Sequence, residues 1–178
     1  MKDFPVYRLS YKGTELCMIQ AAVASGSAAM MADWLYGRGV GAILCCGALD
    51  DIPQGDVILP VCALRRDHYL LPFRFVELPS APIAAICHTL QRYGVSYVQC
   101  ATWSTDGFYR ETPEMVAYRR EEGCRVVEME CAALAAVAQF RKKLLNSCST
   151  AVISSQRAAA MTTGNGGIIA LPERSCFI

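Results

Sequence analysis

The chain has 178 residues and a mass of 19.4 kDa, enough for one compact domain and too few for two ordinary ones. Hydrophobic residues make up 53% of it and charged residues 19%, which excludes a disordered or collagen-like chain. The net charge of +1 gives no reason to expect nucleic acid or an anionic membrane as the main partner. The apolar runs are too short or too interrupted to cross a bilayer, so we expect a soluble protein with no membrane partner.

The ten cysteines are expected to be free thiols. The first residues, Met-Lys-Asp-Phe-Pro-Val-Tyr-Arg, lack the apolar core of a signal peptide, so we expect the reducing cytoplasm as the compartment. No two cysteines have Cys-x-x-Cys spacing, and the two histidines, His68 and His88, are far apart in sequence. These spacings predict no metal site.

The first half of the chain predicts a hairpin, a helix and two further strands. Residues 6–11 and 16–22 are strand-like and flank the turn Lys12-Gly13-Thr14-Glu15. A second turn, Ser25-Gly26-Ser27, leads into a helix over residues 28–36 that glycines end. The two apolar strands that follow span residues 40–46 and 57–64.

The second half continues the alternation of helix and strand. A helix over 81–93 precedes a strand over 95–102. Thr112 and Pro113 then fit the N-cap and first position of another helix. The last two elements are a buried strand and a long helix, at 125–129 and 130–145. This order predicts an α/β domain with a central parallel or mixed sheet and ligands at the carboxyl ends of its strands.

Residues 1–145 are expected to form a single domain, with residues 146–178 as an atypical tail. From Asn146 onward Ser, Thr, Ala and Gly follow one another without a convincing period. We therefore expect this tail to be the least ordered part of the chain.

Two carboxylates lie where strand 125–129 meets the following helix. Glu128 and Glu130 alternate with apolar residues there, and burying a carboxylate is costly unless a partner binds it. Adjacent hydroxyls of a ribose are a natural pair of donors for such a group. The alternative is that Glu130 caps the helix, whose N-terminus favours negative charge.

A polar loop follows strand 95–102 and reads Thr102-Trp103-Ser104-Thr105-Asp106-Gly107-Phe108-Tyr109-Arg110-Glu111-Thr112. Its hydroxyls, acid and aromatic rings suit a flat heterocycle, held by stacking and by hydrogen bonds to its edge. Equally, Phe108 and Tyr109 suit the core beneath the loop, and Asp106-Gly107 suits an ordinary turn.

In this order, the segments resemble the nucleoside phosphorylase superfamily, which includes uridine phosphorylase and the hexameric bacterial purine nucleoside phosphorylases. The resemblance covers roughly residues 5 to 140. It rests on three motifs: Cys46-Gly47-Ala48-Leu49 with Asp51-Ile52-Pro53-Gln54-Gly55-Asp56-Val57-Ile58-Leu59-Pro60, then Thr105-Asp106-Gly107-Phe108-Tyr109-Arg110-Glu111-Thr112, then Val127-Glu128-Met129-Glu130.

The resemblance implies a three-layer α/β/α sandwich with a central mixed sheet, and a pentosyltransferase. Phosphate would attack C1′ of a nucleoside, with uridine expected, and give ribose 1-phosphate and free base. A sugar cation develops in the transition state, where a nearby carboxylate stabilises it. The family implies Glu130 and Asp106 as catalytic residues and adds substrate-binding residues: Met129, Glu128, Phe108, Thr105, Arg65 and His68. It also implies no cofactor beyond phosphate as co-substrate, and a homo-oligomer that is a dimer or a trimer of dimers.

The phosphate end departs from the family pattern. Family members usually carry Arg-x-Gly-Ser/Thr-x-Gly where this chain reads Ala42-Ile43-Leu44-Cys45-Cys46-Gly47. Ala42 then stands at the arginine position and Cys45 at the hydroxyl position. The remaining phosphate-binding candidates are Cys45 and the N–H groups at the start of a helix, those of Ser25, Gly26 and Ser27. For Arg65 the alternative is a solvated surface arginine.

Relative to the family, the chain is expected to be shortened at both ends. It lacks a first strand with a glycine-rich phosphate loop, and a later strand that ends in an aspartate near the base. We hypothesise that residues after about Arg141 are translated from a shifted reading frame, which the nucleotide sequence of the gene tests. Activity is therefore expected to be impaired. The alternatives are a nucleosidase that uses water and a catalytically silent copy.

Overall fold

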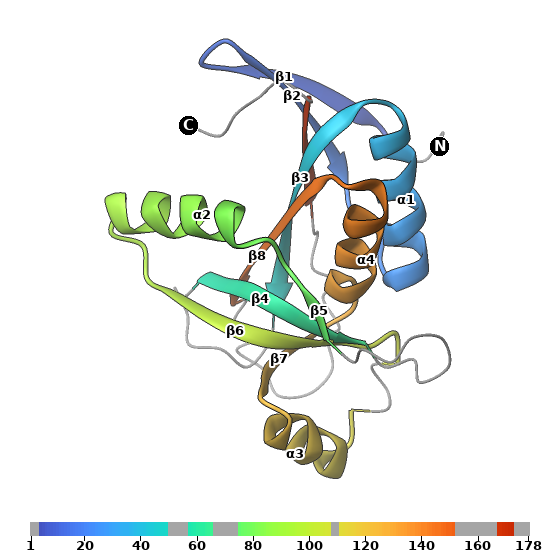
Figure 1. The fold of residues 1–178 in the computed structure, drawn as a ribbon, viewed down its shortest axis with the longest axis vertical. Coiled ribbons are helices and arrows are strands. Elements are labelled where there is room, and N and C mark those ends of the chain that lie inside the picture. The colour runs from blue at the N-terminus through green and yellow to red at the C-terminus, as the bar shows by residue number, and fades with distance from the viewer. Residues whose placement is uncertain (1–3, 50–56, 66–74, 108–110, 152–166, 173–178) are drawn as a thin grey trace.

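The structure is a computed structural model that describes residues 4–49, 57–65, 75–107, 111–151 and 167–172 (Figure 1). Its strands are β1 (Val6–Tyr11), β2 (Thr14–Gln20), β3 (Val40–Leu49), β4 (Val57–Arg65), β5 (Phe75–Glu77), β6 (Tyr97–Ser104), β7 (Cys124–Glu128), β8 (Leu144–Ala151) and β9 (Gly167–Pro172). Its helices are α1 (Ser25–Gly37), α2 (Ser80–Arg92), α3 (Pro113–Glu121) and α4 (Cys131–Arg141). Within these ranges, no helix combines the length and apolarity that crossing a bilayer would require.

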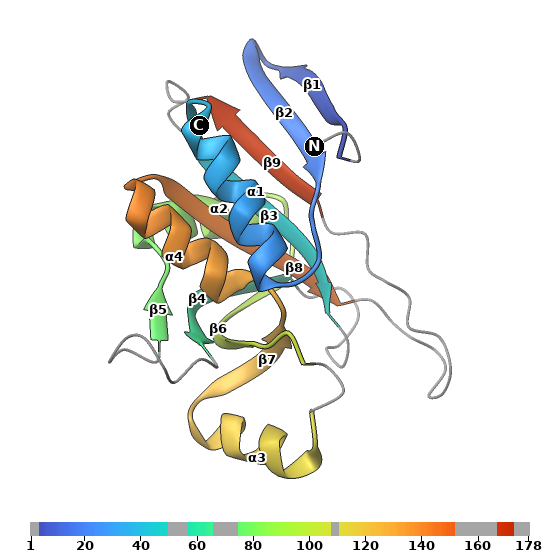
Figure 2. The same cartoon turned by 90° about the vertical axis from the view of Figure 1, so that its right-hand side faces the viewer.

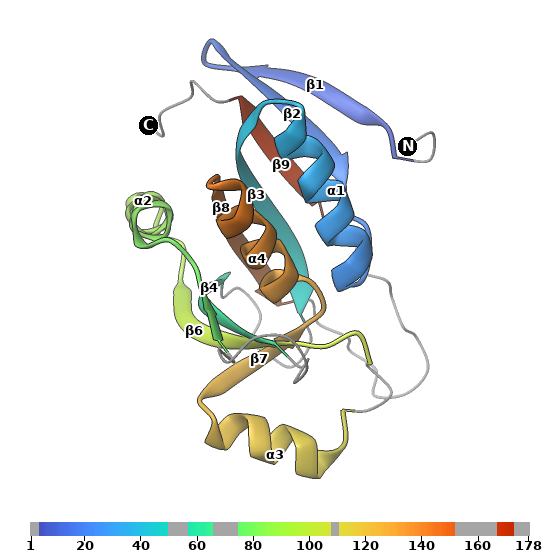
Figure 3. The ribbon, with the colours of Figure 1, turned by 45° about the vertical axis from the view of Figure 1, so that its right-hand side comes forward.

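The strands form one nine-stranded sheet in the order β1-β2-β9-β3-β8-β4-β6-β7, with β5 paired to β4. Pairing is parallel between β3 and β8, between β4 and β6 and between β6 and β7, and antiparallel elsewhere. Figures 2 and 3 show α1 and α4 side by side, α1 near β3 and α4 near β8. The expected α/β/α sandwich with a central mixed sheet is confirmed.

The helices α1 and α4 pack against each other, and each buried face includes alanines. In α1, Ala28, Met31, Ala32 and Leu35 follow helical spacing and are buried. The buried face of α4 is made mainly of alanine. Both faces join the main core, which includes Ile19, Ile43, Leu59 and Leu145.

Several turns form where the sequence predicts them. The hairpin turn between β1 and β2 has positive φ at Lys12 (48°) and Gly13 (79°). At the start of α3, the Thr112 hydroxyl accepts a hydrogen bond from the N–H of Met115 at 3.3 Å. This is an N-cap followed by proline at the first helical position.

The helix expected over residues 130–145 is too long. α4 ends at Arg141 because Lys142 adopts the left-handed conformation, with φ of 53°. The N–H of Lys143 then bonds to the carbonyl of Ala138 at 2.9 Å, which closes the last turn. The next residue, Leu144, begins β8, so the apolar pair that extended the helical pattern belongs to a strand.

The domain boundary expected at residue 145 falls inside β8. This strand pairs along its whole length with β3, and β9 lies between β2 and β3. Three polar residues of β8, Asn146, Ser147 and Ser149, are buried. An interior strand is held by the ladders on both sides, so it forms here without the hydrophobic alternation that would have predicted it.

Candidate active site

Three chain junctions meet at one place in the fold. They are the start of α1 after β2, the end of β6, and the passage from β7 into α4. The N–H of Ala24 donates to Glu130 Oε1 at 2.9 Å, and the N–H of Ser25 donates to Asp106 Oδ1 at 2.8 Å. The hydroxyl of Ser25 donates to the carbonyl of Met129 at 2.6 Å. The structure therefore brings together Ser25, Asp106, Met129 and Glu130, as the sequence predicted for one site.

The carboxylate of Glu128 is fully occupied by protein donors. Its Oε1 accepts from the hydroxyls of Thr102, at 3.2 Å, and of Ser104. Its Oε2 accepts from the backbone N–H groups of Glu130, at 2.7 Å, and of Cys131, at 2.5 Å. Burial raises the pKa of Glu128, and these hydrogen bonds act against that rise.

Glu128 therefore holds the start of α4 rather than a substrate. A carboxylate offers about four acceptor positions, and all four are used here. This corrects the substrate-binding role expected for Glu128. The alternative that Glu130 caps the helix is wrong as well. Glu130 is the N-cap residue of α4, but its own side chain makes no capping bond. Glu128 caps that helix, with help from Ser104, whose hydroxyl accepts from the N–H of Ala132 at 2.9 Å.

Glu130, relieved of capping, points toward the start of α1. Burial is the main cause that raises the pKa of Glu130. The bond from the Ala24 amide lowers it, while the nearby charges of Glu128 and Asp106 raise it further. One oxygen of the Glu130 carboxylate thus already has a backbone partner. A ribose hydroxyl would share the Glu130 carboxylate with the N–H of Ala24.

Ala24 is a site residue that the sequence did not reveal. Its φ of 76° and ψ of 148° lie in a region that is essentially restricted to glycine. In this conformation the N–H of Ala24 points at Glu130 and donates a hydrogen bond to it. In the sequence, Ala24 is marked only by its position directly before the Ser25-Gly26-Ser27 turn. That position does not predict a strained backbone.

The start of α1 retains donors for an anion. Ser25, Gly26 and Ser27 are its first three residues, and Ser25 already donates to Asp106. Within the described ranges, the N–H groups of Gly26 and Ser27 have no protein acceptor, as is usual for a first helical turn. There is open space around Gly26, where an added Cβ would meet no atom within 4 Å. Anions bind readily at such a helix start.

Two of the predicted site residues, Cys45 and Thr105, are buried. Cys45 lies in the main core, where burial raises the pKa of its thiol and the charges of Glu128 and Glu130 add to the rise. A neutral buried thiol beside two carboxylates does not suit phosphate, so the phosphate-binding role expected for Cys45 is corrected. Thr105 is also buried, and its hydroxyl accepts the N–H of Gly107 at 3.2 Å. This bond stabilises the loop that carries Asp106, and the substrate-binding role of Thr105 stays a prediction.

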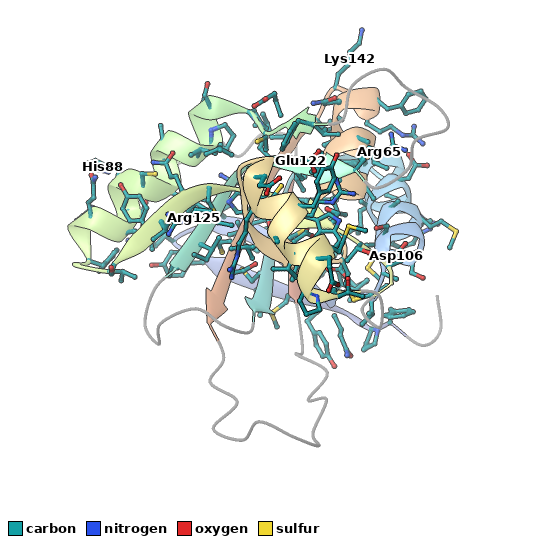
Figure 4. The ribbon with its side chains drawn as sticks, turned by 90° about the horizontal axis from the view of Figure 1, so that it is seen from below. Arg65, His88, Asp106, Glu122, Arg125 and Lys142 are labelled. Atoms are coloured by element: carbon teal, nitrogen blue, oxygen red, sulfur yellow. The ribbon has the colours of Figure 1, made fainter. Side chains whose placement is uncertain are left out.

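The predicted basic residues are only partly described. Arg65 ends β4 and pairs in register with Ser104, so it reaches the same edge of the sheet as the site. Figure 4 shows Arg65 and Asp106 on one side of the molecule, with His88 and Arg125 on the other. His68 and Phe108 lie outside the described residues, and so do the rest of segments 66–74 and 108–110.

Two hollows in the described part of the chain lie away from this cluster. One of about 480 Å³ runs along α2 and is lined by residues such as Glu77 and His88. Another of about 300 Å³ lies beside the end of α4. Neither is lined by Asp106 or Glu130. Among the described residues, no group of three or more His, Cys, Asp or Glu is placed to hold a metal ion.

Residues 1–165 match the sequence profile of the phosphorylase superfamily. The matched region extends beyond the segment that carries the three motifs. A curated relative, guanosine phosphorylase from Halorubrum lacusprofundi, is 25% identical over 182 residues, which cover 98% of this chain and 75% of that protein.

Solved structures share the fold. AMP nucleosidase from Bacteroides thetaiotaomicron has a TM-score of 0.70 and 22% identity, over 84% of this chain and 69% of that one. Purine nucleoside phosphorylase from Toxoplasma gondii, in complex with immucillin-H, has a TM-score of 0.75 and 16% identity, over 85% and 65%. Uridine phosphorylase from Vibrio fischeri has a TM-score of 0.74 and 22% identity, over 84% and 66%.

Proposed function

Because this chain belongs to the phosphorylase superfamily, we propose that it cleaves the N-glycosidic bond of a nucleoside by phosphorolysis. Uridine is the first substrate to test, and guanosine is the second because a curated relative is a guanosine phosphorylase. The products are the free base and ribose 1-phosphate. The observation that carries this proposal is the hydrogen bond from the N–H of Ala24, directly before α1, to Glu130.

The proposal gives Glu130 the role of binding the sugar and gives the neighbouring start of α1 the role of binding an anion. The Glu130 carboxylate accepts hydrogen bonds from the ribose hydroxyls, while the N–H groups of Gly26 and Ser27 take an oxygen of phosphate. Phosphate and C1′ are thereby held next to each other, and this positioning lowers the barrier by removing the entropy of their encounter.

The charges of the site suit the transition state. Positive charge develops on the sugar as the bond from C1′ to the base breaks, and the carboxylates of Glu130 and Asp106 stabilise it more than they stabilise the neutral nucleoside. Met129 packs on the sugar, and Arg65, at the same edge of the sheet, supplies positive charge for phosphate. Glu130 acts as a carboxylate, so its raised pKa sets the acid limb of activity.

Hydrolysis is the second candidate, and a specific observation favours it. The N–H groups of Ala24 and Ser25 are already bound to Glu130 and Asp106. Two carboxylates at the start of α1 repel a phosphate dianion but not a neutral water. In this version Asp106 accepts a proton from the attacking water.

Release of base from uridine and guanosine, measured by chromatography with and without phosphate, tests these candidates. Phosphate-dependent release that yields ribose 1-phosphate supports phosphorolysis, and release of free ribose without phosphate supports hydrolysis. Glu130→Gln should lower kcat about 10²-fold, as expected when a group that stabilises transition-state charge is removed. The matched control is Glu121→Gln on the exposed side of α3. No turnover at high enzyme concentration would favour a silent copy and would overturn both.

We also propose that the chain works in the cytoplasm as a homo-oligomer, a dimer or a trimer of dimers. The hairpin supports self-association, because the β1 residues Tyr7, Leu9 and Tyr11 are exposed at 54%, 43% and 61%. Light scattering of the purified protein tests this, and a monomer at assay concentration would contradict it.

A further inference from the structure

Two cysteines from distant parts of the chain meet across neighbouring strands. Cys46 of β3 and Cys148 of β8 are partners in the parallel register, although they are 102 positions apart in sequence. Their sulfur atoms lie 3.4 Å apart and share a hydrogen bond, with either thiol able to donate. Nine of the ten cysteines fall within the described ranges, all as free thiols.

The backbone geometry suits a covalent bond between these thiols. Adjacent strands lie about 4.8 Å apart, and this spacing is inside the range of about 4.4–6.8 Å that Cα atoms of a disulfide occupy. The sulfur atoms need to approach by a little more than 1 Å to reach the bond length of about 2.05 Å. Rotation of the two side chains can supply much of that movement while the strands keep their pairing.

The two thiols are also chemically unequal. The hydrogen bond from Cys148 lowers the pKa of Cys46 to about 7, while Cys46 and burial raise the pKa of Cys148. The hydrogen bond thus favours the thiolate of Cys46, and the thiolate is the reactive form. Both side chains are only half-buried, so a small oxidant can reach them. By contrast, burial raises the pKa of Cys62, which is also half-buried and lies in β4.

We propose that Cys46 and Cys148 form a redox-active dithiol, which a peroxide converts to an intrachain disulfide that joins β3 to β8. The Cys46 thiolate attacks one oxygen of hydrogen peroxide, which breaks the O–O bond and gives a sulfenic acid and hydroxide. The sulfur of Cys148 then attacks that of Cys46, and a second hydroxide leaves as the S–S bond forms. The two hydroxides become water with the two thiol protons. Two electrons pass from the thiols to the peroxide.

The test is peptide mapping of the reduced, full-length protein after treatment with hydrogen peroxide at neutral pH. We expect a loss of two thiols per chain and a disulfide between the tryptic peptides 39–65 and 144–157. Cys148 is the single cysteine of the second peptide. The first contains Cys45, Cys46 and Cys62, so variants assign the bond.

Cys46→Ser should abolish the crosslink, while the matched control Cys62→Ser should leave it unchanged. Cys148→Ser should stop the reaction at the sulfenic acid of Cys46, which dimedone traps. A crosslink that survives Cys46→Ser, or oxidation of Cys46 in the wild type without a bond to Cys148, would overturn the proposal. Fragmentation of the crosslinked wild-type peptides by tandem mass spectrometry places the bond at Cys45, Cys46 or Cys62, so the proposal is decided even if a variant does not fold. This readout does not depend on enzymatic activity.

Discussion

The carboxylate of Glu130 accepts a hydrogen bond from the backbone N–H of Ala24 at 2.9 Å, across 106 positions of sequence. This bond ties the start of α4 to the start of α1, and the bond from Ser25 to the carbonyl of Met129 reinforces it. The sugar end and the anion end of the proposed site are therefore fixed to each other by the protein before any substrate arrives. Such preorganisation is what catalysis by positioning requires.

Ala24→Gly should stabilise the protein by about 1 kcal/mol. Its backbone conformation costs a non-glycine residue about 1–3 kcal/mol, while glycine adds back some entropy to the unfolded chain. Urea unfolding measures the difference. Ala28→Gly, in the buried face of α1, is the control and should destabilise by about 1 kcal/mol or more. Destabilisation by Ala24→Gly would show that this conformation is not strained.

Glu128→Gln should destabilise the protein by about 2 kcal/mol, although the side chain keeps its shape. The amide replaces one acceptor oxygen with a donor that faces either hydroxyl or backbone donors, and an unsatisfied buried group costs about 1–3 kcal/mol. Denaturant unfolding measures this loss. The control is Glu121→Gln, which should change stability by less than about 0.5 kcal/mol. An equally small effect of Glu128→Gln would contradict its role as the cap of α4.

The stability of the protein should carry a pH dependence that comes from Glu128 and Glu130. Burial raises the pKa of both carboxyls above that of the unfolded chain. Between the unfolded and folded pKa values the native state binds more protons, so this contribution is present below the unfolded pKa and is lost as pH rises through the folded pKa. Urea unfolding at a series of pH values measures the slope.

Removing one of these carboxyls should flatten that slope. Glu130→Gln cannot titrate at this position, so its stability should fall less than that of the wild type as pH rises from about 4.3. In activity assays, kcat of the wild type should fall as the pH is lowered. The midpoint of that fall should lie above the usual pKa of a glutamate. If Glu130→Gln has the same slope as the wild type, the pKa of Glu130 in the wild type is not raised.

Asn146→Leu should stabilise the protein by about 1 kcal/mol. The Asn146 side chain is buried in β8, and within the described part of the chain its Nδ2 has no hydrogen-bond partner. Leucine has a similar branched shape and removes the unpaired amide, at the cost of the bond that Oδ1 accepts from the N–H of Ser147. Thermal unfolding measures the change. Asn146→Asp, which buries a charge in the same space, should lower the melting temperature.

Short-range patterns in the sequence were enough to predict several of the helices and turns. Helical spacing predicts α1, the Thr112-Pro113 pair predicts the start of α3, and glycine in the first hairpin predicts its turn. The positions of Asp106 and Glu130 after strands also marked them as candidates. These features depend on residues within a few positions of one another, which is the range over which backbone preference and amphipathic period act.

The partner that each side chain takes depends on the folded chain. It assigned the cap of α4 to Glu128 rather than Glu130, set Ala24 in a strained conformation, and placed Cys46 beside Cys148. It also built β8 from a polar segment, because the neighbouring strands supply the hydrogen bonds. Each of these outcomes joins segments that are distant in sequence, and a linear pattern carries no signal for pairings that form when the sheet assembles.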